Sequence, residues 1–169
     1  MTAAPQTLVL TGVSGAGKST VGRALADRVG AVLLDADDFH PPANRSKMAQ
    51  GVPLSDEDRD PWIATLAVEL ARRAEAGEHV VLACSALRRD HRLALLDAAP
   101  DVALVHLEVG PEELARRLAE RREHFMPAEL LDSQLADLEH PSAEHHAIVD
   151  GEAPVESVVD EILRVAGAG

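Results

Sequence analysis

The chain has 169 residues, 46% of them hydrophobic and 27% charged, and its 29 acidic and 16 basic side chains give a formal net charge of −13. This length and this balance are typical of one globular domain, so we expect residues 1–169 to fold as a single unit. The negative charge and the scarcity of aromatic residues, which are only Phe39, Trp62 and Phe125, argue against a nucleic-acid partner, since phosphate backbones need basic surfaces and single strands need stacking platforms.

Short continuous apolar runs alternate with helix-length segments along the whole chain. The runs are typical of strands that are buried on both faces, and they cover Leu8–Leu10, Ala31–Leu34, Val80–Cys84, Val102–Leu107 and Ala147–Val149. The predicted helices cover Ser19–Val29, Pro61–Ala76, Arg88–Ala98, Pro111–Arg122, Pro127–Leu138 and Val155–Val165, with Pro61 at a helix start. This order predicts an α/β fold of three layers, α/β/α, around a central parallel sheet of about five strands.

Two stretches interrupt the alternation. Asp35–Asp60 is rich in Pro, Asp, Asn and Arg, and Arg121–Pro141 mixes charges with little continuous hydrophobicity. We expect both to be loops or lids at the carboxyl edge of the sheet, where open α/β sheets bind their ligands.

The sequence also bears on location. Its apolar runs are far shorter than the roughly 20 residues that cross a bilayer. The residues before the first run carry no basic side chain, and the single cysteine, Cys84, cannot form an intramolecular disulfide. We therefore expect a cytoplasmic protein with no membrane partner.

The strongest motif is a complete phosphate-binding loop between the first predicted strand and the first predicted helix. It consists of Gly12, Val13, Ser14, Gly15, Ala16, Gly17, Lys18 and Ser19. Its glycines allow backbone N–H groups to converge on phosphate oxygens, and the following helix N-terminus favours negative charge. We expect Lys18 to reach the β- and γ-phosphates of ATP, Ser19 to ligate Mg²⁺, and Thr20 to add a hydroxyl contact.

The motif does not say what is done with the nucleotide. The sequence lacks the Asn-Lys-x-Asp string that reads guanine, and its third predicted strand ends in Cys84-Ser85 rather than in an acidic residue. These features favour a small-molecule kinase over a GTPase or a motor ATPase.

Two carboxylates follow the second predicted strand. Asp35 and Asp37 would point the same way if the strand continued, because side chains alternate with a period of two. We expect Asp35 to hold the water shell of Mg²⁺ and Asp37 to accept the proton of the attacking hydroxyl.

Beyond the phosphate loop, the chain closely resembles the gluconokinase family over about residues 8–165. The resemblance rests on Asp35-x-Asp37, His40-Pro41, Asn44, Lys47-Met48, Gly51, Pro53-Leu54, Asp56-x-Asp58-Arg59, Pro61-Trp62, Cys84 to Arg88, Arg117-Leu118, Arg121 and His124-Phe125. It implies a P-loop kinase fold with a mobile lid at about residues 121–141, and commonly a homodimer. It also implies ATP-dependent phosphorylation of D-gluconate to 6-phospho-D-gluconate.

A sugar acid needs a cation for its carboxylate and polar groups for its hydroxyls. Arginine suits a carboxylate through its planar fork, and our candidates are Arg45 and Arg88, followed by Arg59. The candidates for binding hydroxyls are His40, Asn44 and Ser85. Trp62 is expected to pack against its own helix rather than to stack on a ligand.

Two further arginines are four residues apart, on one face of the helix that leads into the predicted lid. Similarity to small-molecule kinases with lids implies that Arg117 lies against adenine and that Arg121 reaches the transferred phosphoryl group. The same analogy brings the backbone of Asp150–Pro154 to the adenine edge.

Two alternatives remain open at this point. One is a kinase of shikimate or of another small acid. The other is a regulatory module that binds ATP without transferring phosphate, although Lys18, Asp37 and the lid arginines are all present.

Overall fold

The central element of the computed structural model, which describes residues 4–121 and 128–167, is a five-stranded parallel sheet. Its strand order is β2-β3-β1-β4-β5, so that β1 lies in the middle, between β3 and β4. The strands are β1 (Thr7–Thr11), β2 (Val32–Asp35), β3 (Val80–Ala83), β4 (Val102–Glu108) and β5 (Ala147–Asp150). The predicted α/β fold with a parallel sheet is confirmed.

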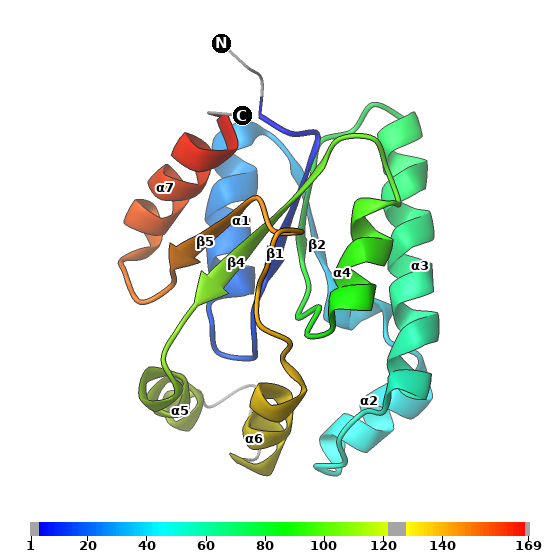
Figure 1. Cartoon of the computed structure of the whole chain (residues 1–169), viewed down its shortest axis with the longest axis vertical. Coiled ribbons are helices and arrows are strands. Elements are labelled where there is room, and N and C mark those ends of the chain that lie inside the picture. Colours follow the sequence, from blue (N-terminus) through cyan, green and yellow to red (C-terminus); the bar gives the residue numbers. More distant parts are fainter. Residues whose placement is uncertain (1–3, 122–127, 168–169) are drawn as a thin grey trace.

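Helices cover both faces of the sheet (Figure 1). Helices α1 (Lys18–Val29) and α7 (Val155–Gly167) pack side by side on one face. On the other face, α3 (Asp56–Glu75) packs against α4 (Arg89–Leu96). The remaining helical elements are η1 (a 3₁₀ helix, Ala36–Phe39), α2 (Pro42–Ala49), α5 (Pro111–Glu120) and α6 (Ala128–Asp137).

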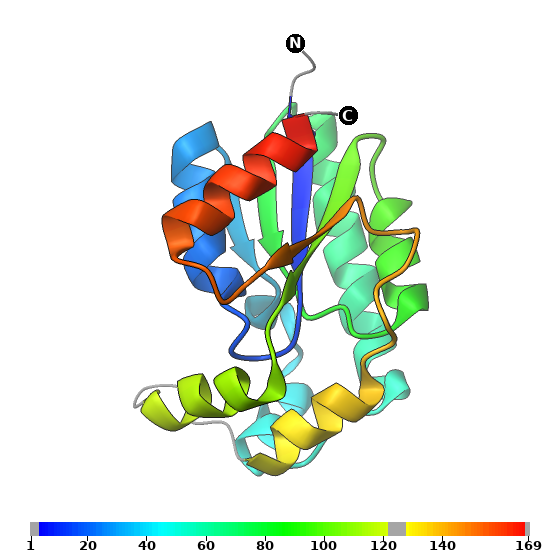
Figure 2. The ribbon, with the colours of Figure 1, turned by 60° about the vertical axis from the view of Figure 1, so that its left-hand side comes forward.

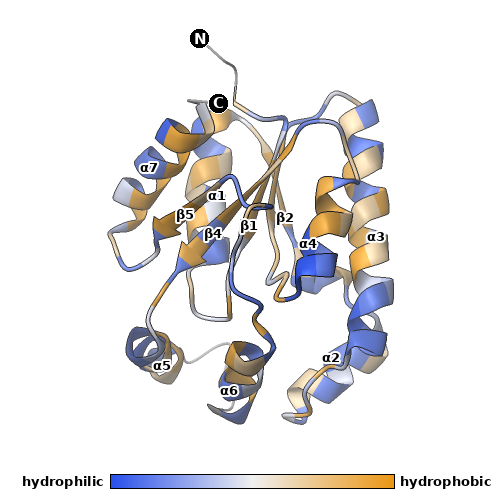
Figure 3. Cartoon of the chain, in the orientation of Figure 1, coloured by the Kyte–Doolittle hydropathy of each residue, from blue (hydrophilic) through white to orange (hydrophobic). Residues whose placement is uncertain are grey.

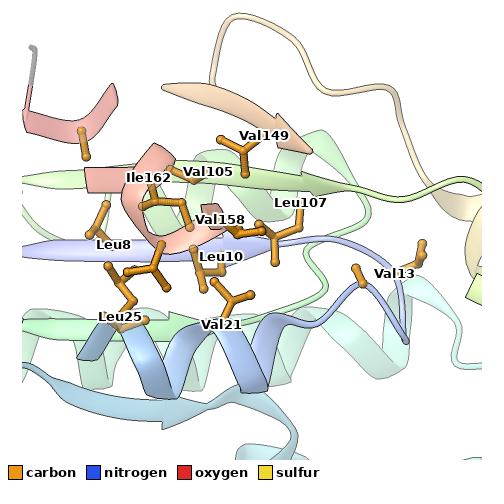
Figure 4. Packing of buried hydrophobic residues seen from close by; sticks show 14 of the residues in the cluster. Leu8, Leu10, Val13, Val21, Leu25, Val105, Leu107, Val149, Val158 and Ile162 are labelled. Carbon is orange, nitrogen blue, oxygen red and sulfur yellow. The ribbon is translucent and has the colours of Figure 1, made fainter. Parts of the chain in front are cut away.

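The core consists of two aliphatic clusters, one on each face of the sheet. Leu8 and Leu10 of β1 face the α1 and α7 side, where they lie near residues such as Leu25 and Ile162 (Figure 4). Val9, between them in sequence, belongs to the opposite cluster with Trp62. Strand β1 is therefore hydrophobic on both faces, and β4 and β5 are coloured largely as hydrophobic along their length (Figure 3).

The carboxyl ends of the strands meet at the end of the molecule away from the two termini. Helices α2, α5 and α6 gather at this end in both views (Figures 1 and 2). The loop between β1 and α1 opens toward them, so this edge is the place where the sequence motifs converge.

Helix α3 begins at Asp56, five residues before the predicted start at Pro61, so that prediction was wrong. The reason is a capping box at its start: Ser55 Oγ accepts a hydrogen bond from the backbone N–H of Asp58, and Asp58 Oδ2 accepts one from Ser55 N–H. Pro61 lies inside the helix on its exposed side, so α3 continues through it without the hydrogen bond that a backbone N–H at this position would donate. Residues 35–60, predicted as a loop, in fact contain η1, α2 and this first part of α3.

The predicted lid at 121–141 falls partly on residues 122–127, which lie outside the described residues, as do His124 and Phe125. Its described part contains α6, and the predicted helix at 127–138 is confirmed over 128–137. Within the described residues, no helix is both long enough and apolar enough to cross a membrane.

Candidate active site

The phosphate loop adopts a backbone that requires glycine. Gly12, Gly15 and Gly17 have φ angles of 147°, 89° and 95°, in the region that side chains disfavour. A Cβ atom on Gly12 would also lie 3.1 Å from the backbone oxygen of Leu107. Helix α1 then begins at Lys18 without a side-chain cap, so its first N–H groups stay available for an anion.

A cavity of about 100 Å³, here called the phosphate-loop cavity, opens beside this loop. Ser14, Gly15, Gly17, Lys18 and Ser19 form one of its walls. The rest of its lining comes from Asp35, Asp37, Met48, Ala83, Ser85, Arg121 and Gln134. The structure thus brings the predicted lysine, both predicted carboxylates and Arg121 around one space.

Lys18 is the main positive charge on the loop side of this cavity. Its Nζ donates a hydrogen bond to the carbonyl oxygen of Val13 at 3.0 Å. Loss of solvation lowers the pKa of Lys18, while the carboxylates of Asp37 and Asp35 oppose that shift. An anionic phosphate would favour the charged ammonium further, as the predicted role requires.

The two carboxylates are placed differently from the prediction, although both line the cavity. Strand β2 ends at Asp35, and its side chain caps the next turn by accepting a hydrogen bond from Asp37 N–H at 3.0 Å. The strand does not continue to Asp37, because η1 follows β2 directly, so the two carboxylates do not share one face of a strand. The tight turn brings Asp37 to the same cavity by a different route.

Asp37 combines an exposed side chain with a raised pKa. Its side chain meets solvent, but the surrounding recess limits its solvation and raises its pKa, and the neighbouring charge of Asp35 adds to this shift. Lys18 acts in the opposite direction. A carboxylate with a raised pKa is a better proton acceptor than an ordinary surface aspartate.

A second, smaller cavity lies between α3 and α6 and is here called the α3–α6 cavity. Its volume is about 40 Å³, which is room for only a few water molecules. Its polar lining is Arg59, Ser85, Ser133 and Gln134, and its apolar lining is Met48, Val52, Pro53, Leu54, Trp62, Leu87 and Leu130. Met48, Ser85 and Gln134 line both cavities, so the two spaces are neighbours.

Arg59 is the candidate arginine that lines the α3–α6 cavity. It is almost completely buried, and its Nη2 donates to Asp137 of α6 at 2.9 Å. A buried guanidinium with this one carboxylate beside it is positioned to meet a second carboxylate in the cavity.

Arg45 and Arg88 lie elsewhere. Arg45 donates to the backbone oxygens of His40 and Asp38, at 3.3 and 2.8 Å. Arg88 lies 3.1 Å from Glu139, and neither arginine is among the residues that line the two cavities described above.

His40, Asn44 and Trp62 form a packed group behind Asp37. The His40 ring stacks on Trp62 with a centroid distance of 4.0 Å, and Asn44 Nδ2 lies 3.1 Å from His40 Nδ1. Trp62 Nε1 donates to the backbone oxygen of Ala36 at 2.7 Å, so the indole is held by residues outside its own helix. Burial lowers the pKa of His40 to about 4, so its ring is neutral near pH 7, with Nε2 3.8 Å from Asp37.

The loop that carries Ser85 is held by a buried arginine that the sequence did not single out. Arg92 is fully buried, and its Nη1 donates to the backbone oxygens of Ala86 and Leu87. These contacts hold Ala86 at a φ of 40°, a conformation that costs free energy for a residue other than glycine. Arg92 also pairs with the buried Glu144 at 2.7 Å.

Arg117 joins the phosphate loop to the loop after β5. Its Nη1 donates to Gly15 O at 3.2 Å, and its Nη2 donates to Gly151 O at 2.9 Å. It therefore borders the two backbone segments that were predicted to surround the nucleotide. Thr20 is exposed on α1, while Val13 and Ala16 are buried beneath the loop.

The residues fit the two groups that the motif implies. The uncapped helix, the left-handed glycines and Lys18 suit the phosphates of ATP. Ser19 Oγ donates to Asp35 Oδ2 at 3.2 Å, and this pair of oxygens suits Mg²⁺, a hard cation. No cluster of three His, Cys, Asp or Glu side chains occurs within the described ranges, so a cation would have to draw further ligands from water and phosphate.

Gln134 is a polar cavity residue that the sequence did not single out. It lies on α6 and lines both cavities. A lone glutamine in a helix carries no motif, and only the packing of α6 against the phosphate loop brings it to the site.

The parallel sheet, the phosphate loop and the facing carboxylates define a P-loop protein of the small-molecule kinase class. A family model described as an AAA domain matches residues 8–141. The chain is 45% identical to the gluconokinase of Gluconobacter oxydans, over 95% of this chain and 90% of that protein. It is also 45% identical to a probable gluconokinase of Xenopus tropicalis, over 92% of this chain and 90% of that one. The crystal structure of a gluconokinase from Sinorhizobium meliloti matches with a TM-score of 0.88 and 42% identity, over 97% of this chain and 93% of that one. The chain therefore belongs to the gluconokinase family.

Proposed function

We propose that the protein transfers the γ-phosphoryl group of ATP to the terminal hydroxyl of D-gluconate, which gives ADP and 6-phospho-D-gluconate. The observation that carries the proposal is the meeting of two cavities in a member of the gluconokinase family. One holds the phosphate loop and the other holds the buried Arg59, and Ser85 lines both.

On the nucleotide side, the backbone of Gly12 to Ser19 and the ammonium of Lys18 bind the phosphates. Arg117, which already bridges Gly15 and Gly151, would face the adenine. Arg121, at the end of α5, lines the phosphate-loop cavity and would stabilise charge on the transferred group.

On the acceptor side, Arg59 would pair with the gluconate carboxylate, and Ser85 would hydrogen-bond to a hydroxyl. His40, Asn44, Arg45 and Arg88 were also predicted to bind the acceptor. Their contacts support an indirect role for His40 and Asn44, which pack behind Asp37.

The transfer forms a bond between the gluconate oxygen and the γ-phosphorus as the bond to the ADP oxygen breaks. Asp37 would hold the hydroxyl in line and take its proton, and the proton then passes to solvent. Its raised pKa supports this role, because the site already disfavours its charged form.

Mg²⁺ is part of the proposal. Ser19 and Asp35 would hold it, Ser19 by direct ligation and Asp35 through its water shell, and the cation would neutralise charge on the phosphates. We further propose, from the family resemblance, that the enzyme works in the cytoplasm and forms a homodimer. Sedimentation of the purified protein would test the homodimer.

The experiment is a coupled assay of ADP release with ATP and Mg²⁺ over a panel of acceptors. The panel contains D-gluconate, shikimate, adenylylsulfate and nucleoside monophosphates. We expect turnover on gluconate to exceed that on every other acceptor, and product analysis should find the phosphate on the terminal carbon.

A further inference from the structure

The side chain of Gln134 is hydrogen-bonded to a backbone N–H group of the phosphate loop. Its Oε1 accepts a hydrogen bond from the backbone N–H of Ser14 at 2.9 Å. Its Nε2 lies 3.4 Å from Ser14 Oγ and donates to it, so both ends of the carboxamide face one loop residue. The loop and α6 are 120 positions apart in sequence and meet at this contact.

The contact fills a place that suits a phosphate oxygen. Ser14 lies within the loop whose N–H groups converge on phosphates, and it lines the same cavity as Lys18. Lys18 is likewise bonded to a protein acceptor, the carbonyl of Val13. A charged phosphate oxygen is a stronger acceptor than a neutral amide, so a nucleotide can replace the carboxamide at Ser14.

The same side chain also limits the neighbouring space. The α3–α6 cavity, at about 40 Å³, is too small for a six-carbon sugar acid, and Gln134 lies between it and the phosphate-loop cavity. If the carboxamide leaves Ser14, it stays at the boundary of the two cavities, near Ser85 and Arg59. There its donor and acceptor groups can meet the hydroxyls of the acceptor.

We propose that Gln134 couples the two substrates by exchanging partners. It binds the Ser14 N–H in the nucleotide-free protein, a terminal phosphate oxygen of ATP displaces it, and the freed carboxamide then binds a hydroxyl of the sugar acid. The acceptor half of this proposal rests on the proposed function, whereas the nucleotide half does not.

Helix α6 has other attachments, so Gln134 can be replaced without unfolding the site. Leu130 and Leu131 are buried, and Asp137 pairs with Arg59. Replacement by leucine keeps the size of the side chain and removes both polar groups.

The first test is calorimetric titration of a non-hydrolysable ATP analogue with Mg²⁺, in the absence of any acceptor. Gln134→Leu removes the internal competitor, so we expect the analogue to bind about threefold to tenfold more tightly than to the wild type. Gln134→Glu supplies a charged acceptor to Ser14 and repels phosphate, so it should bind the analogue more weakly. The control is Gln50→Leu, the same change at an exposed glutamine on the end of α2, which should leave affinity unchanged.

The second test measures gluconate affinity with and without the analogue. In the wild type the analogue should tighten gluconate binding, and in Gln134→Leu this coupling should fall at least about threefold. Analogue binding to Gln134→Leu that is unchanged or weaker overturns the exchange at Ser14. Tighter analogue binding with the coupling preserved overturns the acceptor role. A wild type that binds no gluconate would refute the proposed function, and the first test would still decide the exchange.

Discussion

The hydroxyl of Ser19 donates a hydrogen bond to Oδ2 of Asp35 at 3.2 Å, which joins the end of the phosphate loop to the end of β2. The other oxygen of the same carboxylate accepts the N–H of Asp37. Asp35 therefore fixes two things at once, the hydroxyl that would ligate Mg²⁺ and the turn that carries the proposed base.

Asp35→Asn should change the dependence of turnover on Mg²⁺. The amide keeps a hydrogen bond to Ser19 but loses the charge that attracts the cation. We expect the Mg²⁺ concentration for half-maximal turnover to rise by about tenfold, which is the loss of roughly 1.4 kcal/mol. Steady-state rates over a range of Mg²⁺ concentrations measure this, and a curve that coincides with the wild type would refute the metal role of Asp35.

Asp37→Asn should lower turnover strongly while leaving ATP affinity within a few-fold of the wild type. The substitution removes the proposed base but leaves the phosphate loop, which would hold most of the nucleotide. Loss of general-base catalysis typically costs about 10²-fold to 10⁴-fold in rate. The neighbouring Asp38→Asn is the control, because Asp38 is exposed and lines neither cavity.

Results for these two variants would also show whether the proposed roles of Asp35 and Asp37 must be exchanged. If Asp37→Asn keeps near-normal turnover and Asp35→Asn loses it, Asp35 is the base. If both variants remain active, the enzyme acts by positioning alone and no side chain takes the proton.

Lys18→Ala should remove most turnover and leave the fold intact. In its proposed role Lys18 would stabilise charge that develops on the phosphates, and loss of such a contact costs roughly 3 kcal/mol, or about a hundredfold in rate. Arg23→Ala, which removes an exposed positive charge from the same helix, is the control. A variant that is folded by circular dichroism and keeps more than about a tenth of wild-type turnover would contradict this role.

Stability should fall as the pH is lowered from 7 to 5. Burial lowers the pKa values of His40, His106 and His145 to about 4, against 6.5 for a free histidine. Between these values the unfolded chain binds protons that the folded chain does not, so protonation favours unfolding. Carboxylates with lowered pKa values, such as Glu144, also stabilise the folded state. That stabilisation is lost only when the pH falls below about 4.5 toward their lowered pKa values.

Urea unfolding at pH 7, 6 and 5 measures this effect, and we expect a total loss of at least about 2 kcal/mol by pH 5. His145→Gln should reduce the loss of unfolding free energy between pH 7 and 5, because it removes one of the three rings whose pKa is lowered by burial. The His145 ring lies within hydrogen-bond distance of the buried Thr11 hydroxyl, as does the His106 ring. Replacement of the exposed His79 by glutamine should leave the loss of unfolding free energy unchanged. A free energy of unfolding that is flat from pH 7 to 5 would show that these rings are protonated in the folded state.

The sequence alone predicts the sheet and the phosphate loop because both are local patterns. Continuous apolar runs mark buried parallel strands, and the spacing from Gly12 to Ser19 carries its own backbone geometry. The start of α3 is also a local signal, since Ser55 and Asp58 have the spacing of a capping box, whereas the predicted start rested on Pro61 alone.

The acceptor side was harder to predict because it depends on packing between distant segments. The sequence offers three arginines for the acceptor carboxylate, Arg45, Arg59 and Arg88. Only the packing of α3 against α6 brings one of them, Arg59, to a cavity. The position of Gln134 on Ser14 has the same origin. Sequence motifs predicted the residues proposed to act on phosphate, whereas the positions of the residues around the proposed acceptor site required the fold.

The most direct test of the central claim is the ratio of kcat/KM for D-gluconate to that for shikimate, with ATP and Mg²⁺ in the same assay. A site built to bind the hydroxyls and carboxylate of one acid discriminates strongly against an acid that leaves those groups unpaired. We expect a ratio above about 10³. The variant Arg59→Ala should lower kcat/KM for gluconate mainly by raising KM. Turnover on shikimate that equals or exceeds turnover on gluconate would contradict the assignment.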